Sequence, residues 1–148
     1  MSLACASMGL VLSKAKWATE RLKTYLPFIQ RFRGKKWISY PEGIELPRHT
    51  DGNIFRLKDG SVMISMVSFW RSFRKVEGAD QNVQVTSRLP DAADMQYVYA
   101  ASLDLAETRR LEPERSGDTL RITVPRHGKA TVILLSPRPD PALEAALK

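Results

Sequence analysis

The sequence is poor in the residues that build disulfides and metal sites. Its 148 residues include one cysteine, Cys5, and two histidines, His49 and His127. A single cysteine excludes an intrachain disulfide framework and any multi-cysteine zinc or iron–sulfur site. Two histidines are too few for a histidine-rich metal site. We therefore expect no metal, and we interpret Cys5 as a buried small apolar side chain.

Long hydrophobic runs are missing as well. The apolar stretch 2–12 is shorter than the roughly 20 residues that a membrane-spanning helix needs. Lys14 and Lys16 follow this stretch, whereas the positive charges of a secretory signal precede its apolar core. We expect no targeting signal and no membrane partner, and the compartment stays open.

Glycine-rich phosphate loops are also lacking. The eight glycines form neither a Gly-x-Gly-x-x-Gly pattern nor a Walker-type run, so we expect no nucleotide and no other cofactor. The composition, 43% hydrophobic and 26% charged, is that of a globular domain. It excludes collagen-like, low-complexity and wholly disordered proteins.

What the sequence does have is a strongly asymmetric charge. The formal net charge is +7, and residues 1–36 contain eight basic residues against a single acidic one. Residues 37–148 contain fifteen of each sign and are therefore neutral as a whole. Such a basic N-terminal segment could meet phosphates, an anionic membrane or an acidic face of another domain.

The same segment has the periodicity of an amphipathic helix. Between Ser13 and Phe32, apolar residues recur every three or four positions, and the basic residues lie mostly off that stripe. Ser13 suits a helix N-cap, Gly34 suits the C-terminal stop, and Pro27 should kink or divide the helix. The stripe consists of Ala18, Leu22, Tyr25 or Leu26, Ile29 and Phe32. We expect a docking helix with Trp17, Leu22 and Ile29 among its packing residues.

Helical spacing is lost after residue 40, and β-like patterns take over. Residues 41–52 are punctuated by proline and glycine and predict a linker. Six short runs separated by turn signals follow, which is typical of an antiparallel sandwich or barrel. The runs are 53–58, 61–70, 82–87, 95–101, 119–124 and 130–135. Asp59-Gly60 between the first two predicts a hairpin turn.

These patterns predict a mostly β fold, an antiparallel β-sandwich preceded by an N-terminal helical segment. We expect a strand and helix in residues 1–40, the linker 41–52, the sandwich 53–136 and a flexible tail 137–148. Within the sandwich, the charged stretch 102–116 is interpreted as a surface connection. The tail should hold only a short, frayed helix over residues 141–147.

No catalytic constellation emerges from the titratable residues. His49 lies beside Asp51 in the linker, and His127 lies in the tight connection 125–129, so we interpret both histidines as loop or turn residues. Glu107, Glu112 and Glu114 alternate with arginines and indicate a solvated surface. The aspartates at predicted turns, where Asp supports the backbone, are Asp51, Asp59, Asp80, Asp91, Asp94 and Asp118.

One group of side chains has the composition of a binding surface. Phe69, Trp70 and Phe73 interleave with Arg71 and Arg74 at the end of a predicted strand. Aromatic and guanidinium groups together suit stacking on bases or sugars. The alternative is the end of a core strand plus an interface to a neighbouring domain.

Three stretches resemble a known type of domain. They are NIFRLKDGSVMISMVSF (53–69), LPDAADMQYVYAAS (89–102) and GDTLRITVPRHGKATVILLS (117–136). The third is the best signature, with a Gly-Asp turn, an alternating strand, a proline, a short polar turn with histidine and a final apolar strand. Together they resemble the C-terminal β-sandwich that follows the (β/α)8 barrel in glycoside hydrolases of the α-galactosidase-like type.

The resemblance implies a non-catalytic accessory module. Residues 2–12 and the following helix are similar to the last strand and helix of such a barrel. The chain is then expected to be the C-terminal portion of a larger enzyme, or an open reading frame that starts at an internal methionine. No position matches the family's catalytic carboxylates, so none is assigned. The implied role is to stabilise the catalytic barrel, in cis or as a partner domain.

Two other function classes stay open. The basic helix with Phe69, Trp70 and Phe73 could form a nucleic-acid-binding module, although the neutral sandwich half argues against it. The same aromatic residues could instead make a carbohydrate-binding module. Binding of nucleic acid would depend steeply on the salt concentration, whereas binding of a neutral sugar would depend on it little.

Overall fold

The fold is described by a computed structural model, which covers residue 30 and residues 34–38, 43–69, 78–102, 104–105 and 107–147. Within these residues lie ten strands, a 3-10 turn and a short helix, and Gln30 and Phe69 are also helical. The strands are β1 Lys36–Trp37, β2 Ile44–Glu45, β3 Thr50–Arg56, β4 Val62–Ser68, β5 Asp80–Arg88, β6 Tyr97–Ser102, β7 Glu107–Leu111, β8 Glu114–Ser116, β9 Thr119–His127 and β10 Ala130–Ser136. The 3-10 turn η2 spans Ala92–Asp94, and the helix α4 spans Pro141–Glu144.

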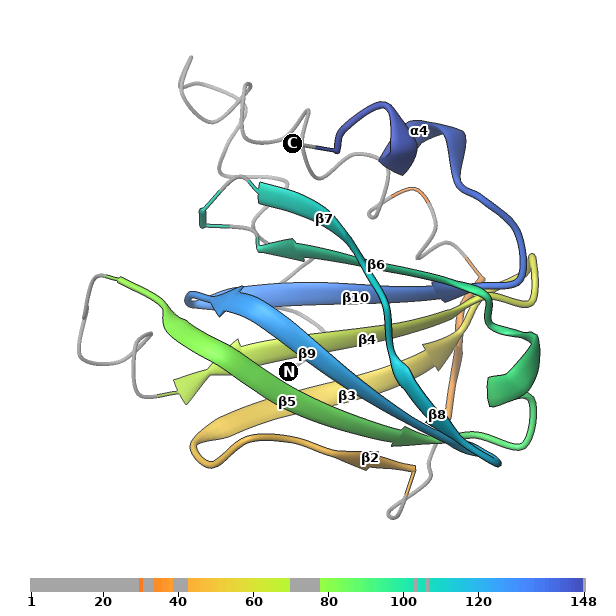
Figure 1. Cartoon of the computed structure of the whole chain (residues 1–148), viewed down its shortest axis with the longest axis horizontal. Helices are drawn as coiled ribbons and strands as arrows, with labels where there is room; N and C mark the ends of the chain where they lie inside the picture. The colour runs from red at the N-terminus through yellow and green to blue at the C-terminus, as the bar shows by residue number, and fades with distance from the viewer. Residues whose placement is uncertain are drawn as a thin grey trace.

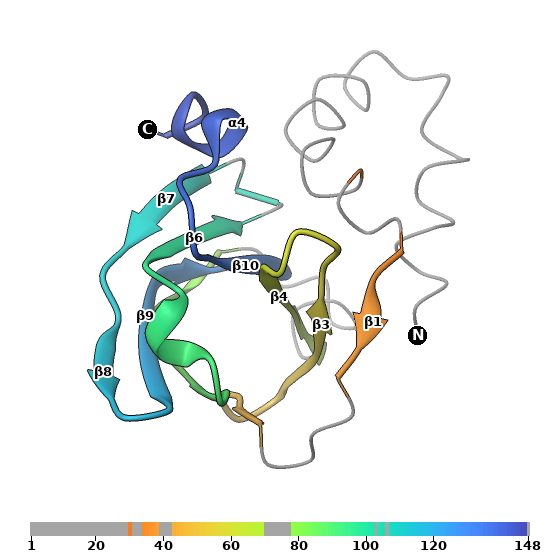
Figure 2. The same ribbon diagram turned by 90° about the vertical axis from the view of Figure 1, so that its right-hand side faces the viewer.

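The strands form two antiparallel sheets (Figure 1). One sheet has the order β1-β3-β4-β10-β6-β7, and the other has the order β2-β5-β9-β8. The two sheets face each other when the molecule is viewed from the side (Figure 2). The chain is therefore mostly β and forms an antiparallel β-sandwich, which confirms the predicted fold class.

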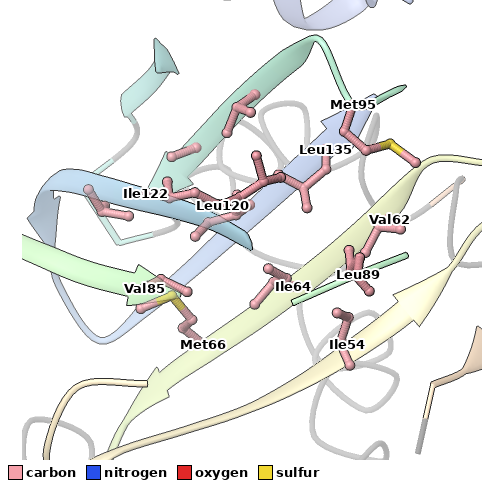
Figure 3. Close-up of a cluster of buried hydrophobic side chains, with 14 of the residues drawn as sticks. Ile54, Val62, Ile64, Met66, Val85, Leu89, Met95, Leu120, Ile122 and Leu135 are labelled. Carbon is pink, nitrogen blue, oxygen red and sulfur yellow. The ribbon is translucent and has the colours of Figure 1, made fainter. Parts of the chain in front are cut away.

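The core between the sheets follows from the alternating residues of the strands. On β5 and β9, Val83 pairs with Val124 and Val85 pairs with Ile122, and all four are at most 8% exposed. Side chains of β4 and β10 meet them from the other sheet (Figure 3). Each such buried aliphatic side chain contributes about 1.5–3 kcal/mol, an upper estimate because unfolded chains already bury some apolar surface.

The middle of the six-stranded sheet is buried on both faces. Its outer face carries a second apolar cluster, made of Leu57, Met63, Tyr99, Ala101, Val132, Leu134 and Leu143. Residues 131–136 of β10 are all buried, which explains why this strand is a nearly continuous apolar run in the sequence. Leu143 reaches this cluster from α4, which lies over the β6–β7 side of the sheet (Figure 2).

The turn signals locate two of the connections. Gly60 closes the β3–β4 hairpin with φ of 85°, a left-handed conformation that favours glycine. Asp59 supports the same turn, because its Oδ1 accepts a hydrogen bond from the Ser61 N–H at 3.0 Å. Gly117, with φ of 55°, lies in the turn between β8 and β9.

The structure adds edge strands that the sequence did not predict. Part of the predicted linker 41–52 belongs to the sandwich, since β2 pairs with β5 and β3 already begins at Thr50. The stretch 102–116, expected to be a surface connection, contains β7 and β8. The strands β2, β7 and β8 lie at sheet edges, where charged side chains remain in water and hide the β pattern.

The tail also differs from the expectation. Residues 137–148 were expected to be flexible, but Asp140 caps α4 by accepting from the N–H groups of Ala142 and Leu143 at 3.0 and 3.1 Å. Leu143 is 1% exposed. A helix of one turn gains its stability from such packing and capping, which local sequence periodicity does not reveal.

Apart from Gln30, the predicted N-terminal helix over residues 13–32 lies outside the described residues, and so do its expected packing residues Trp17, Leu22 and Ile29. Gln30, which the structure does describe, is helical. Gly34 has φ of 73°, the conformation typical of a glycine that ends a helix.

Candidate functional site

Of the predicted aromatic and basic surface, the structure describes Phe69 alone. Phe69 follows directly after β4, is partly buried, and donates its N–H to the His49 carbonyl at 3.1 Å. The other four residues, Trp70, Arg71, Phe73 and Arg74, lie outside the described residues. Whether these five side chains form one surface therefore stays a prediction.

Phe69 lies at one end of the sandwich, where three connections meet. The Ser68 N–H donates to the Lys129 carbonyl at 2.9 Å, which joins the end of β4 to the β9–β10 turn. His49 belongs to the turn that precedes β3, has φ of 64° and is exposed. This placement agrees with the interpretation of His49 as a loop residue.

His127 corrects the sequence interpretation. It was interpreted as a turn residue, but it is the last residue of β9 and is 0% exposed. Its Nδ1 lies 2.8 Å from the Thr131 hydroxyl at the start of β10. The strand extends past Pro125 because Asp80 and Gln81 of β5 continue to pair with it.

A chain of hydrogen bonds leads from His127 through two buried hydroxyls. The Ser102 hydroxyl donates to the Arg126 carbonyl at 2.6 Å, and it lies 3.3 Å from the Thr131 hydroxyl. Since a hydroxyl carries one proton, Thr131 donates to Ser102 and accepts from the Nδ1–H of His127. All three side chains are at most 5% exposed. These hydrogen bonds therefore join β6, β9 and β10, and the three side chains are not accessible to a substrate.

Asp104 closes the same end of the sandwich. Its carboxylate accepts hydrogen bonds from the backbone N–H groups of Lys129 at 2.9 and 3.0 Å and of Ala130 at 3.3 Å. A Cβ on Gly128 would collide with this carboxylate, so a larger residue at position 128 would displace the Asp104 side chain from these hydrogen bonds. The carboxylate thus supplies the hydrogen-bond acceptor that these two backbone N–H groups need.

Glu107, expected on a solvated surface, is mostly buried and pairs with two arginines whose side chains are nearly half exposed. Its Oε1 pairs with Arg126 of β9, and its Oε2 lies 3.6 Å from Nε of Arg109. Its side chain is 20% exposed. The pair with Arg126 ties β7 of one sheet to β9 of the other, whereas Arg109 lies on β7 itself, so the carboxylate helps to hold the layers together through Arg126.

The opposite end of the sandwich is held by Arg56 and Asp91. The guanidinium donates to both carboxylate oxygens, at 2.8 Å through Nη2, and also to the Gly60 carbonyl at 3.0 Å. These hydrogen bonds hold the pKa of Asp91 below its ordinary value and raise that of Arg56. Arg115 supports η2 beside them by donating to the carbonyls of Ala92 and Met95 at 3.0 and 2.6 Å.

Tyr99 anchors α4 to the six-stranded sheet. Its hydroxyl donates to Glu144 Oε1 at 2.5 Å and accepts from the Asp140 N–H at 3.2 Å. Burial, together with the neighbouring Glu144 carboxylate, raises the pKa of Tyr99 to about 12. The phenol therefore stays protonated and acts as a structural hydrogen-bond donor at neutral pH.

A surface hollow of about 270 Å³ lies between the β3–β4 hairpin and the start of the tail. Ser61 and Ser136 meet at its base, with their hydroxyls 3.3 Å apart. Asp59, Pro137, Arg138, Pro139 and Asp140 complete the lining. No local pattern in the sequence predicted this hollow, because Ser61 and Ser136, which both line it, are 75 residues apart in the sequence.

In the described part of the chain, no three His, Cys, Asp or Glu side chains gather where they could hold a metal ion. In the same part of the chain, no helix has the length and apolar character needed to cross a membrane.

Comparisons with known proteins give little further information. No model of a protein family matches the chain, and no curated protein matches it either. Among solved structures, it is similar to α-L-fucosidase isoenzyme 2 from Paenibacillus thiaminolyticus, with a TM-score of 0.48 and 15% identity over 66% of this chain. It is also similar to the catalytic domain of GH30 xylanase C from Talaromyces cellulolyticus, with a TM-score of 0.41 and 12% identity over 62% of this chain.

A third similar structure is the GH51 arabinofuranosidase from Xanthomonas axonopodis pv. citri, with a TM-score of 0.35 and 14% identity over 67% of this chain. All three are glycoside hydrolases. The chain spans only 16%, 18% and 20% of their respective lengths. With every TM-score below 0.5, the likeness carries no argument about activity or substrate.

Proposed function

We propose that the chain is a non-catalytic β-sandwich module of a glycoside hydrolase, which packs against a catalytic barrel and stabilises it. The observation that carries this proposal is the fold of residues 117–136, the most specific of the stretches that resemble such a domain. The Gly-Asp turn leads into β9, His127 ends that strand, and β10 follows in the other sheet. The motif thus forms the crossing between the two layers.

The contacts of the carboxylates support a structural role. Asp91 pairs with Arg56, Glu107 pairs with Arg126, and Asp104 caps the β9–β10 turn. Each of these carboxylates joins segments that are distant in the sequence. The module would act through burial against its partner, and a standard interface of about 800 Å² per partner would hold it rigidly.

The nucleotide sequence upstream of Met1 tests this proposal directly. An in-frame extension that encodes barrel strands ending in acidic residues would make the chain the tail of a glycoside hydrolase. In that longer protein, deleting residues 53–136 should lower the Tm of the barrel. A stop codon and a ribosome-binding site just before Met1 would overturn the proposal and move the nucleic-acid hypothesis to first place.

A further inference from the structure

The surface hollow beside the β3–β4 hairpin is lined by polar side chains from two separate segments. The hairpin turn forms one wall, and the linker from β10 to α4 forms the other (Figure 1). Three of the lining residues are more than nine-tenths buried, since Ser61, Ser136 and Asp140 are 1%, 6% and 2% exposed. Buried polar groups in a concave site offer a ligand a fixed set of hydrogen-bonding atoms.

The hairpin wall has a fixed shape. The Leu57 N–H donates to the Ser61 carbonyl at 2.8 Å, and the Gly60 N–H donates to the Leu57 carbonyl at 3.2 Å. The Arg56 guanidinium, which is paired with Asp91, donates to the Gly60 carbonyl at 3.0 Å. The turn is therefore held by the sandwich itself and needs no ligand to order it.

The linker wall is stiff as well. Pro137 and Pro139 restrict their own φ angles to about −65°. The Ser136 hydroxyl donates to the Arg138 carbonyl at 2.7 Å and accepts from the Arg138 N–H at 3.3 Å. Asp140 then caps α4, which fixes the far end of the linker. With both walls formed in advance, a ligand would bind at little cost in conformational entropy.

The groups in the lining suit a neutral molecule that carries several hydroxyls. Two carboxylates, Asp59 and Asp140, face one guanidinium, Arg138, so the carboxylates would repel an anion and the guanidinium would repel a cation. Carboxylates accept hydrogen bonds from hydroxyl groups, and a guanidinium donates to hydroxyl oxygens. The rings of Pro137 and Pro139 add apolar surface for C–H groups. A sugar ring combines these features.

We propose that the hollow binds one ring of a neutral sugar, with Asp59 and Asp140 as acceptors and Arg138 as donor. Asp140 Oδ1 accepts two hydrogen bonds from α4, and Asp59 Oδ1 accepts one from the Ser61 N–H, whereas a carboxylate has about four acceptor sites. The volume of about 270 Å³ lies just below the range of about 300–1,000 Å³ for small-molecule pockets, so it suits a single ring. We expect a Kd of about 1–10 mM.

Amide NMR spectra of the full chain test the proposal. They are recorded with D-glucose, D-galactose or D-xylose at concentrations up to about 100 mM, well above the expected Kd. At least one of these sugars should shift the amides of residues 59–61 and 136–140 in a saturable way. Arg138→Ala should raise the Kd severalfold, since the exposed guanidinium donates to the sugar. Asp59→Asn, which keeps an oxygen for the turn, should also raise it.

Arg121→Ala is the matched control, because Arg121 is a half-exposed arginine of the four-stranded sheet. It should leave the Kd unchanged. The absence of saturable shifts in the hollow with all three sugars would overturn the proposal, and so would an equal Kd in Arg138→Ala and Arg121→Ala. Saturable shifts there with methylammonium chloride alone would assign the hollow to a cation and overturn it too. The upstream nucleotide sequence does not enter this result, so the proposed function can fail independently.

Discussion

The Thr131 hydroxyl is the central link of the buried hydrogen-bond chain. It accepts from His127 and donates to Ser102, and its side chain is 0% exposed. Thr131→Val keeps the shape of the side chain and leaves both partners without this bond. We expect the free energy of unfolding to fall by about 1–3 kcal/mol, the cost of unsatisfied buried polar groups. Urea unfolding followed by fluorescence measures the loss.

Thr123→Val is the matched control for this prediction. Thr123 is exposed on the outer face of β9, so the same substitution should change stability by no more than about 0.5 kcal/mol. Equal losses in the two variants would show that the hydrogen-bond chain contributes nothing beyond strand propensity.

The Arg56–Asp91 pair makes a pH-dependent contribution to stability. The pKa of Asp91 is lowered from 3.8 in the folded chain, so its contribution is complete above that value and is lost as the pH falls through the folded pKa. Both side chains are about 30% exposed, which limits the contribution to about 1 kcal/mol or less. Asp91→Asn should therefore be less stable than the parent at pH 7 and equally stable near pH 2, as measured by denaturant titrations.

The exposed pair Arg121–Glu114 is the comparison for this experiment. Its side chains are 55% and 75% exposed, so Glu114→Gln should leave the pH dependence of stability unchanged. A difference between parent and Asp91→Asn that persists at pH 2 would contradict the assignment of the effect to the ionised pair.

Individual residues differ in how far the sequence could place them. The turn at Gly60 was predictable because an Asp-Gly pair encodes its own backbone conformation. The burial of His127 was not predictable, because it depends on the Thr131 hydroxyl of the next strand and on Ser102. Ser102 and Thr131 are 29 residues apart in the sequence. The pairing of Arg56 with Asp91 could not be predicted from the sequence, because two residues that are 35 positions apart leave no local signal of their contact.

At the scale of elements, α4 shows how a short helix is held by distant contacts. Tyr99 binds Glu144 and Asp140 around the first turn of the helix. In Tyr99→Phe, both bonds are lost while the ring remains. We expect the α4 amides to exchange with deuterium severalfold faster, whereas β9 and β10 keep their protection. Tyr97→Phe, which retains its ring beneath Arg110, is the control. Unchanged α4 exchange in Tyr99→Phe would contradict the anchoring role.

Strands in the middle of the sheets were predictable, and edge strands were not. The runs on β5 and β9 alternate because one face packs in the core, as with Val85 and Ile122. The edge strand β7 has the sequence ETRRL, in which charged side chains dominate. Its pairing with β6 comes from the register of Ala100 with Arg109 and of Tyr99 with Arg110, which is set by the tertiary fold.

The whole molecule combines a neutral sandwich with a basic segment. Residues 37–148 contain equal numbers of acidic and basic residues, and several of these form ion pairs within the sandwich. The net charge of +7 comes from residues 1–36. The accessory-module and nucleic-acid hypotheses place this segment against different partners, and the dependence of binding on salt distinguishes binding to nucleic acid from binding to a neutral sugar.

Binding to single-stranded DNA gives the last prediction. If the segment contacts phosphates only through its eight basic residues, the affinity should fall by about 10³-fold between 50 and 200 mM salt. We expect this loss in fluorescence anisotropy with a labelled oligonucleotide, because the neutral sandwich adds no attraction of its own. A neutral polysaccharide in the same assay is the control, since its binding would not depend on salt. A dissociation constant below about 1 µM at 200 mM salt would contradict the accessory-module proposal, because non-specific contacts alone do not reach that affinity and a dedicated nucleic-acid surface would then be required.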